Sequence, residues 1–242
     1  MSCFSEIVRR TKVLTFDCYG TLIDWDAGLF GVFREVFGSE VNRRRRELFE
    51  AYVTIEAELE SGSFRSYREV VTVALERLAA RFEWVLPANR RGAIADTLPN
   101  WRPFADTGEA LARLKKRFRL GVLSNIDREL FTGTARHFPV AFDFVITAQD
   151  VGAYKPSAAH LQRFLRDFGG LGSSIHVAQS LFHDGRPAGE LGVAFVWINR
   201  YKEANGTTVR PLVEFADLRS FADAVDAVMG ERHDRLEPDD RV

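Results

Sequence analysis

The chain has 242 residues, of which 46% are hydrophobic, and its 33 Lys and Arg residues against 34 Asp and Glu residues give a formal net charge of −1. This composition excludes a disordered or collagen-like chain, and the length fits one large domain or a core with a smaller second domain. The balanced charge offers no electrostatic basis for binding nucleic acid or an anionic membrane. The expected partner is therefore a small molecule.

The sequence carries no targeting signal that we can identify. No segment reaches the roughly 18 consecutive apolar residues that a membrane span requires, and the N-terminus lacks the apolar run and cleavage site of a secretory signal. Cys3 and Cys18 are too few to form a disulfide framework, so we expect reduced thiols. These features predict a cytoplasmic protein.

The first predicted elements are a buried strand and a long helical interval. Residues 12–18 form a short apolar run that ends in the turn Tyr19-Gly20-Thr21, as in a buried parallel strand. The interval 25–103 then shows no strand pattern but has helical spacing of its apolar residues. Leu48, Tyr52, Ile55 and Leu59 share one helical face, and Tyr67, Val71, Ala74, Leu75, Leu78 and Phe82 share another.

Four further apolar runs predict the remaining strands, at 120–124, 144–147, 176–180 and 194–199. Each adjoins a segment with helical spacing, which predicts an α/β fold with a doubly wound, mainly parallel sheet covered on both faces. We therefore predict a core domain of residues 1–24 plus 104–242, with an α-helical cap domain inserted at 25–103. The charged last dozen residues are expected to be a solvated tail.

Polar residues follow several of the predicted strands. Asp17 ends the first, Ser124 and Asn125 end the second, Lys155 comes after the third, and Ser180 and Asp184 follow the fourth. The carboxyl ends of parallel strands meet at one edge of the sheet, so these side chains are expected to converge. Taken singly, each has another explanation, because Asp and Ser cap turns and helices and Lys is usually a solvated cation.

Four motifs in this order resemble the haloacid dehalogenase superfamily: Phe16-Asp17-Cys18-Tyr19-Gly20-Thr21-Leu22, Leu123-Ser124-Asn125, Tyr154-Lys155-Pro156 and Asp184. The resemblance runs from about residue 12 to about residue 200. It implies a nucleophilic Asp17, with Ser124, Lys155 and Asp184 as the residues of the later motifs. It also implies that the helical interval is the cap.

The residue two positions after Asp17 indicates the branch of the superfamily. Phosphatases have a second Asp there, which protonates the leaving alcohol, whereas this chain has Tyr19. A phenol titrates near 10 and cannot replace that acid, so the leaving group is expected to need no proton, as halide does. The motif Asp-x-Tyr-Gly-Thr with Ser-Asn resembles the L-2-haloacid dehalogenase branch, which implies neither metal nor cofactor.

The resemblance implies a role for each motif residue. Asp17 would attack the carbon that bears the halogen of a short 2-haloalkanoic acid and form an ester, which water would then cleave. Lys155 would hold Asp17 ionised, and Thr21 and the turn amides would support the same carboxyl group. Ser124 would bind the substrate carboxylate and Asn125 the halide. Asp184 and Ser180 would position the water.

The resemblance also implies a cap arginine that grips the anionic substrate. Arg43-Arg44-Arg45-Arg46 could simply be a solvated helix face, but at 100° per residue Arg44 and Arg45 flank the apolar stripe that begins at Leu48. An ungapped comparison favours Arg44 for the substrate-binding role. Arg65 and Arg68 remain rivals.

The fourth motif departs from the dehalogenase pattern at Leu181 and His183, where the family tends to have Asn and an aromatic residue. His183 could act as a base or could cap the following helix. We keep a magnesium-dependent phosphatase, in which Asp17 and Asp184 share the metal, as an alternative. A non-catalytic relative that binds a metabolite is another, and a homodimer formed through the cap stays open.

Overall fold

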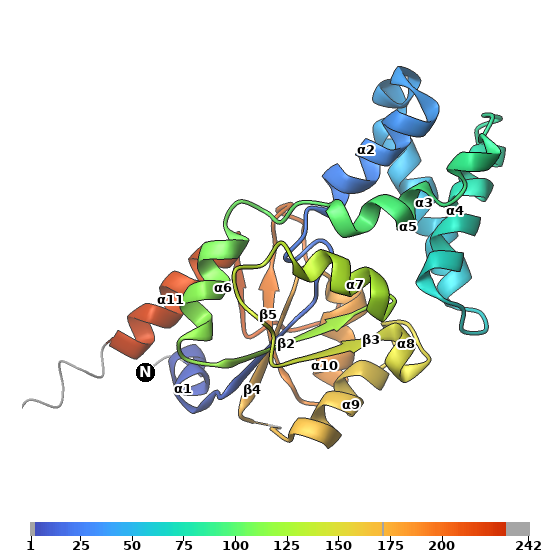
Figure 1. The fold of residues 1–242 in the computed structure, drawn as a ribbon. Coiled ribbons are helices and arrows are strands. Elements are labelled where there is room, and N and C mark those ends of the chain that lie inside the picture. Colours follow the sequence, from blue (N-terminus) through green and yellow to red (C-terminus); the bar gives the residue numbers. More distant parts are fainter. Residues whose placement is uncertain (1–2, 171, 231–242) are drawn as a thin grey trace, which may run out of the picture.

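A computed structural model describes residues 3–170 and 172–230, and its core is one parallel sheet (Figure 1). All five strand pairs are parallel, in the order β3-β2-β1-β4-β5-β6. The strands are β1 (Val13–Phe16), β2 (Arg119–Ser124), β3 (Phe144–Thr147), β4 (Ser174–Ala178), β5 (Ala194–Ile198) and β6 (Val213–Phe215). The predicted doubly wound α/β sheet is confirmed.

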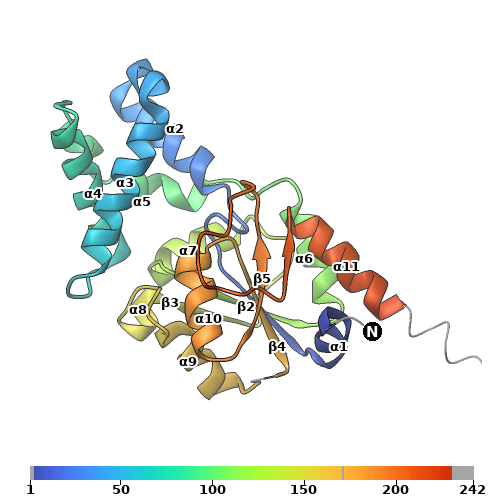
Figure 2. The same ribbon diagram turned by 180° about the vertical axis from the view of Figure 1, so that it is seen from behind.

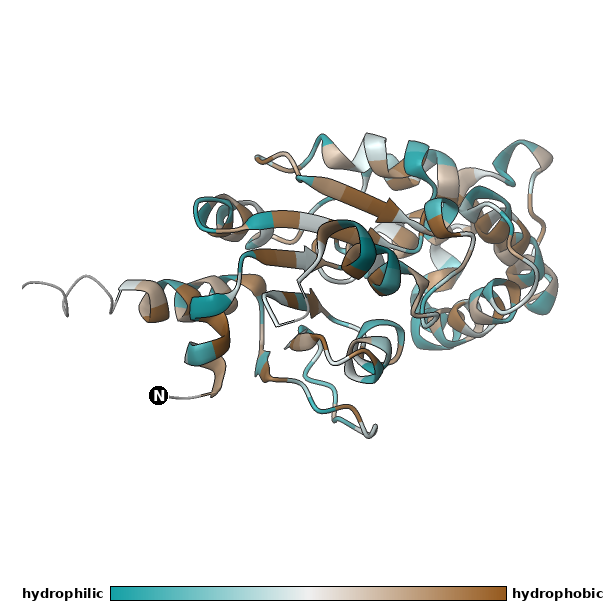
Figure 3. Ribbon diagram, turned by 90° about the horizontal axis from the view of Figure 1, so that it is seen from below, coloured by the Kyte–Doolittle hydropathy of each residue, from teal (hydrophilic) through white to brown (hydrophobic). Residues whose placement is uncertain are grey.

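Helices cover both faces of this sheet, so successive residues of β1, β2 and β4 are buried although their side chains point to opposite faces (Figures 1 and 2). On one face, Leu14 packs in a cluster with α1 (Cys3–Arg10), α6 (Thr107–Lys115) and α11 (Leu218–Gly230). On the other face, its neighbour Val13 packs with α9 (Ala159–Phe168) and α10 (Arg186–Glu190). The short helices α7 (Arg128–Ala135) and α8 (Ala148–Val151) follow β2 and β3. Figure 3 shows the apolar strands between these layers.

The interval between β1 and β2 is helical and stands beyond the carboxyl ends of the strands (Figures 1 and 2). Its helices are α2 (Trp25–Phe37), η1 (Ser39–Arg44), α3 (Arg45–Glu60), α4 (Tyr67–Arg81), η2 (Ala88–Arg90), α5 (Ala93–Thr97) and η3 (Leu98–Asn100). Every residue of the two predicted apolar faces is buried. We call this interval the cap; the domain boundaries at 24/25 and 103/104 stay a prediction.

Three elements differ from the expectations. β6 has no counterpart in the predicted set, because it is three residues long and its side chains are half-buried or exposed. β4 begins two residues before the predicted 176–180 run, and α1 lies where no element was predicted. The predicted solvated tail, residues 231–242, lies outside the described residues.

Two further expectations bear on the chain as a whole. Cys3 is exposed, Cys18 is buried, and both are free thiols. Within the described residues, no helix combines the length and the apolar character needed to cross a membrane.

The two chain crossings between core and cap lie side by side. Asp24 N–H donates to Arg102 O at 2.9 Å, and Phe104 N–H donates to Leu22 O at 3.1 Å. Trp101, which is buried, packs over Gly28 in the first turns of α2, so closely that a Cβ on Gly28 would lie 2.2 Å from the indole ring. Because Gly28 has no side chain, α2 can lie in direct contact with Trp101 beside the two chain crossings.

Gly28→Ala should destabilise the protein, because the new methyl group overlaps the Trp101 ring. We expect a loss of about 1–3 kcal/mol in the free energy of unfolding, as for other overpacked sites, measured by urea denaturation. Gly31→Ala is the matched control, since it lies in the same helix with nothing within 4 Å of the added Cβ. Helix propensity should make that change neutral or stabilising. Equal effects of the two substitutions would contradict the packing argument.

Candidate active site

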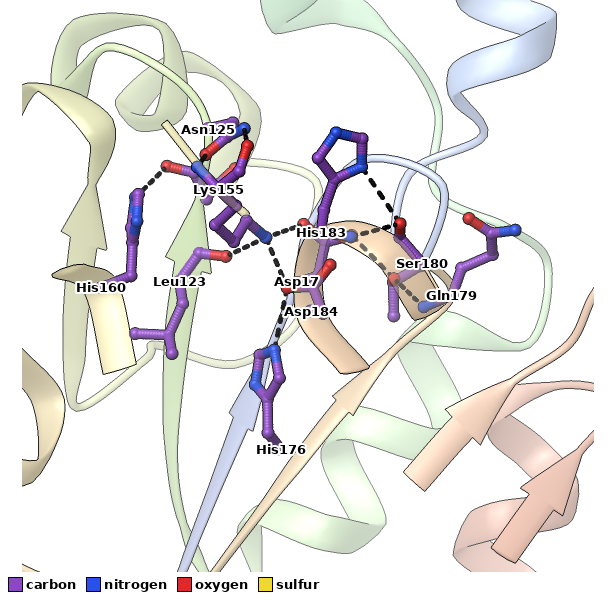
Figure 4. A network of polar contacts seen from close by, with 12 residues as sticks. Asp17, Leu123, Asn125, Lys155, His160, His176, Gln179, Ser180, His183 and Asp184 are labelled. Carbon is purple, nitrogen blue, oxygen red and sulfur yellow. Dashed lines mark hydrogen bonds and ion pairs between the residues drawn. The ribbon is translucent and has the colours of Figure 1, made fainter. Parts of the chain in front are cut away.

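The polar residues predicted from the strand ends converge at one edge of the sheet (Figure 4). β1 lies between β2 and β4, so Asp17 is flanked by Ser124 at the end of β2 and by η4 (Leu181–Gly185), the π-helical turn that follows β4 and carries Asp184. Lys155 reaches them from the loop after α8. Together with cap residues these side chains line a cavity of about 830 Å³.

Lys155 lies at the centre of this arrangement and is only 4% exposed. Its Nζ donates to Asp17 Oδ1 at 2.8 Å, to Asp184 Oδ1 at 2.7 Å and to Leu123 O at 3.0 Å (Figure 4). Burial alone would lower the pKa of Lys155, but the charges of Asp17 and Asp184 outweigh it and raise that pKa above its usual value. The ammonium is therefore charged and fixed between the two carboxylates.

The second carboxylate oxygen of Asp17 is held by Thr21. Thr21 Oγ1 donates to Asp17 Oδ2 at 2.8 Å and accepts from Gln179 N–H at 2.9 Å. The turn amides expected to help do not do so: Gly20 N–H donates to Ile23 O, and within the described residues no backbone N–H donates to the Asp17 carboxylate. The turn folds back on itself, which directs the Gly20 N–H away from Asp17. Asp17 is thus oriented by two side chains, Thr21 and Lys155.

Asp184 is buried and has a partner that the sequence did not reveal. His176 Nε2 lies 2.9 Å from Asp184 Oδ1, and His176 Nδ1 lies 2.9 Å from Thr15 Oγ1, its cross-strand neighbour in β1. Burial would raise the pKa of Asp184, but Lys155 and His176 lower it overall. Asp184 Oδ2 has no hydrogen-bond partner among the described residues. A histidine inside an otherwise apolar strand was the available signal.

Asn125 and Ser124 have different roles in the structure. The Asn125 side chain holds the main chain of Lys155 on both sides, accepting from Lys155 N–H at 2.7 Å and donating to Lys155 O at 3.1 Å. Ser124 Oγ is buried at the cavity wall and has no hydrogen-bond partner among the described residues. Behind it, His160 Nε2 lies 3.3 Å from Ser124 O, and burial together with the Lys155 charge lowers the pKa of His160 to about 3. Asn125 thus positions Lys155, while the Ser124 hydroxyl is free for a ligand.

Ser180 and His183 form a local pair at the start of η4. Ser180 Oγ accepts from His183 N–H at 3.0 Å and lies 3.1 Å from His183 Nδ1 (Figure 4). Burial is the main cause that lowers the pKa of His183. Both residues line the cavity, so a ligand can reach them although Ser180 also caps the first turn of η4.

Tyr19 lines the cavity, and its hydroxyl is held by a neighbouring threonine. Its OH is 2.7 Å from Thr134 Oγ1, and its ring meets Trp101 edge-on at 6.3 Å between centroids. Burial raises the pKa of Tyr19 well above the ordinary value. This side chain therefore does not supply a proton at neutral pH.

Arg44 does not reach the cavity, contrary to the sequence prediction. Its guanidinium donates twice to Glu47, at 2.9 Å each, and lies over the Phe82 ring on the outside of the cap. The periodicity argument failed because α3 begins only at Arg45, and Arg44 belongs to the preceding 3-10 turn, where 100° per residue does not apply. The rivals Arg65 and Arg68 line a separate hollow.

The cap instead contributes carboxyl groups that sequence reasoning missed. Glu56 and Glu60, one turn apart on α3, line the cavity. Glu56 Oε1 accepts from Tyr52 OH at 3.1 Å and from Tyr67 OH at 2.9 Å, and Glu60 Oε2 accepts from Asn125 Nδ2 at 3.5 Å. Burial raises the pKa of Glu56 to about 7, and burial plus the Glu56 charge raises that of Glu60 to about 9.

The core also holds the cap through the main chain of α4. The Asp127 carboxylate accepts from Tyr67 N–H and Arg68 N–H, both at 2.9 Å. Nearby, Tyr154 OH donates to Arg65 O at 2.8 Å. The N–H groups of the first helical turn have no partner within their own helix, and Asp127 accepts hydrogen bonds from two of them. Its negative charge also lies at the positive end of the helix dipole, which is stabilising. These contacts close the cap over the cavity.

The comparisons agree with this architecture. The haloacid dehalogenase-like hydrolase family matches residues 11–177, and the chain belongs to that family. The (S)-2-haloacid dehalogenase of Pseudomonas fluorescens is 26% identical over 205 residues, covering 81% of this chain and 88% of the relative. That of Pseudomonas sp. strain YL is 24% identical over 230 residues, covering 91% and 97%. The predicted resemblance to this branch is confirmed.

A solved structure gives the same result for the fold. It is the L-2-haloacid dehalogenase from Xanthobacter autotrophicus with chloropropionic acid covalently bound. The TM-score is 0.77 at 16% sequence identity, and the match covers 89% of this chain and 98% of that one. At this identity, the likeness supports the sheet with its helical cap.

Lys155→Met should destabilise the protein strongly, because two buried carboxylates lose the cation between them. We expect the free energy of unfolding to fall by about 3–5 kcal/mol at pH 7, measured by chemical denaturation. Lys115→Met is the control, since Lys115 pairs with Asp143 at the surface, where a salt bridge contributes at most about 1 kcal/mol. Similar losses in the two variants would argue against the buried pairing.

Glu60→Gln should stabilise the protein at high pH. An unfolded Glu titrates near 4.3, whereas the folded Glu60 titrates near 9, so the folded state binds more protons between these values and its stability falls as pH rises. Thermal unfolding should therefore show a larger gain for the variant at pH 9 than at pH 5. Glu58→Gln, an exposed position on the same helix, should show no such difference between the two pH values.

Proposed function

We propose that this protein is a cofactor-free dehalogenase that displaces halide from a short 2-haloalkanoic acid through an ester on Asp17. The observation that carries the proposal is the Asp17 carboxylate, held by Lys155 at 2.8 Å and by Thr21 at 2.8 Å at the floor of the cavity. Both contacts fix the orientation of the carboxylate, as a nucleophile requires. The names of the curated relatives supply the substrate class.

In the first step, an oxygen of Asp17 bonds to the carbon that bears the halogen. The carbon–halogen bond breaks with its electron pair on the halide, and the carbon inverts. Ser124 Oγ, which is buried without a partner beside Asp17, is placed to donate to the substrate carboxylate. The halide leaves without a proton, so a general acid is not needed.

In the second step, water cleaves the ester. Its oxygen bonds to the Asp17 carboxyl carbon, one of its protons goes to the departing 2-hydroxy acid, and the other is released as the Asp17 carboxylate is restored. Asp184 Oδ2 has a free acceptor position that suits the orientation of this water. Ser180 and His183 line the same cavity, and the low pKa of His183 keeps its imidazole neutral and able to accept a hydrogen bond.

The phosphatase alternative fits the geometry less well. Its chemistry needs an acid two residues after the nucleophile, and Tyr19 has its hydroxyl on Thr134 and a raised pKa. Within the described ranges, no group of three or more His, Cys, Asp or Glu side chains is arranged to hold a metal ion. Hydrolysis of a phosphate ester that is stimulated by added magnesium would favour the phosphatase over the dehalogenase.

The test is chloride release from chloroacetate and L-2-chloropropionate in the presence of EDTA. Asp17→Asn should lower the rate by at least about 10⁴-fold, as removal of a nucleophile does elsewhere. Multiple turnovers in ¹⁸O-labelled water should also place the label in the Asp17 carboxyl group, detectable by mass spectrometry of the peptide. This follows because water attacks the carboxyl carbon and not the substrate.

Asp167→Asn is the matched control, since this carboxylate pairs with arginines on the exposed side of α9. It should retain activity within about twofold. Chloride release that persists in Asp17→Asn, or label found only in the product, would refute the ester mechanism. Binding of haloacids without any turnover would instead support the metabolite-binding alternative.

A further inference from the structure

The charge of the cavity does not match a substrate that is only an anion. Asp17 and Asp184 pair with Lys155, and five more acidic side chains line the cavity: Asp26, Glu50, Glu56, Glu60 and Glu203. Among the residues that the structure describes, Lys155 is the one Lys or Arg that lines it. A cavity lined mainly by one sign of charge attracts the opposite sign.

Lys155 is not available to bind a negatively charged group of the substrate. An ammonium has three N–H donors, and those of Lys155 go to Asp17, Asp184 and Leu123 O. No donor is left for a carboxylate on the substrate. The neutral hydroxyl of Ser124 remains, since it is 1% exposed and has no partner. The floor of the cavity therefore offers a neutral donor for one polar group of a ligand.

The cap side of the cavity offers acceptors. Glu56 and Glu60 lie four residues apart on α3 and so project on the same side of the helix. Each has one oxygen committed, Glu56 Oε1 to two tyrosines and Glu60 Oε2 to Asn125. Glu56 Oε2 and Glu60 Oε1 accept no hydrogen bond from the described residues. The Glu56 charge also acts on Glu60 and helps to raise its pKa, a repulsion that a bound cation would relieve.

The remaining wall is aromatic. Trp25, Phe49 and Tyr67 line the cavity, with Trp25 and Phe49 edge-to-face at 5.7 Å between centroids. Such rings pack against an alkyl chain and also attract a cation by their quadrupoles. The guanidinium of Arg45 lies over Phe30 and Phe49 and its charge acts on Asp26. It does not line the cavity beside Glu56 and Glu60.

We propose that the substrate carries a positively charged amino group, which the free oxygens of Glu56 and Glu60 bind while the reacting carbon lies at Asp17. This inference rests on the proposed function and narrows its substrate class to amino-bearing 2-haloacids. The carboxylate of such a substrate meets Ser124, its chain lies along the aromatic wall, and its amino group reaches α3. The positive charge of the amino group thereby favours the ionised form of both carboxyl groups, so Glu60 gives up its proton when the ligand binds.

The kinetic test compares (S)-6-amino-2-chlorohexanoate with (S)-2-chlorohexanoate, which differ only in the amino group. Chloride release at pH 8, corrected for an enzyme-free blank, should give the amino compound a kcat/KM about tenfold higher or more, since hydrogen bonds between charged groups contribute about 1.5–3 kcal/mol. Glu60→Gln should reduce this ratio to about threefold or less. The exposed Glu58→Gln control on the same helix should preserve it.

A binding test separates this inference from the proposed chemistry. Calorimetry with wild-type protein should show tighter binding of 6-aminohexanoate than of hexanoate, neither of which has a halogen to displace. Preferential binding without chloride release from any haloacid would retain the amino-group site and reject the dehalogenase. Chloride release that is equal for the two chloro acids, or faster for the unsubstituted one, would reject the amino-group site. So would hexanoate binding as tightly as 6-aminohexanoate.

Discussion

A buried ammonium between two carboxylates holds the strand ends of this protein together. Removing Lys155 from water is costly, and the cost is offset only where every N–H has an acceptor in good geometry. Asp17, Asp184 and Leu123 O provide those acceptors from three segments far apart in the sequence. The order β2-β1-β4 brings them within reach, so this buried ion-pair network depends on the topology of the sheet.

Around this ion pair, buried polar groups support each other in a chain. Asn125 fixes the main chain of Lys155, and Thr15 orients His176, which in turn bonds to Asp184. Asn125 and Thr15 thus act on the buried ion pair through a neighbour, and His176 contacts it directly. Such networks are stabilising when fully satisfied. Two fully buried oxygens, Ser124 Oγ and Asp184 Oδ2, have no partner among the described residues, and a ligand or water can complete the network there.

The fold could be predicted well where burial controls the sequence. Five of the six strands are apolar on both sides because helices cover both faces of the sheet, and the cap helices carry regular apolar stripes. β6 was not predicted, because an edge strand whose side chains are partly exposed does not need an apolar run. The position of Asp17, Ser124 and Asp184 followed from the strand-end rule, since each lies at or just beyond a strand.

The cap side of the site could not be predicted in the same way. A helix carries no rule like the one for strand ends, and Glu56 and Glu60 have the spacing of an ordinary solvated face. Their proximity to Asn125 and Tyr67 depends on how α3 and α4 lie against the core. Arg44 was wrongly predicted to line the cavity. The prediction applied the 100° per residue of an α-helix to a residue that lies in a 3-10 turn.

The anchoring of α4 by Asp127 has a consequence for how such enzymes diverge. Its two hydrogen bonds come from the main chain at Tyr67 and Arg68, and any residue except proline supplies an N–H there. The anchor at Asp127 therefore does not depend on which side chains stand at positions 67 and 68. The residues that line the cavity from α4 can differ without loss of these two hydrogen bonds.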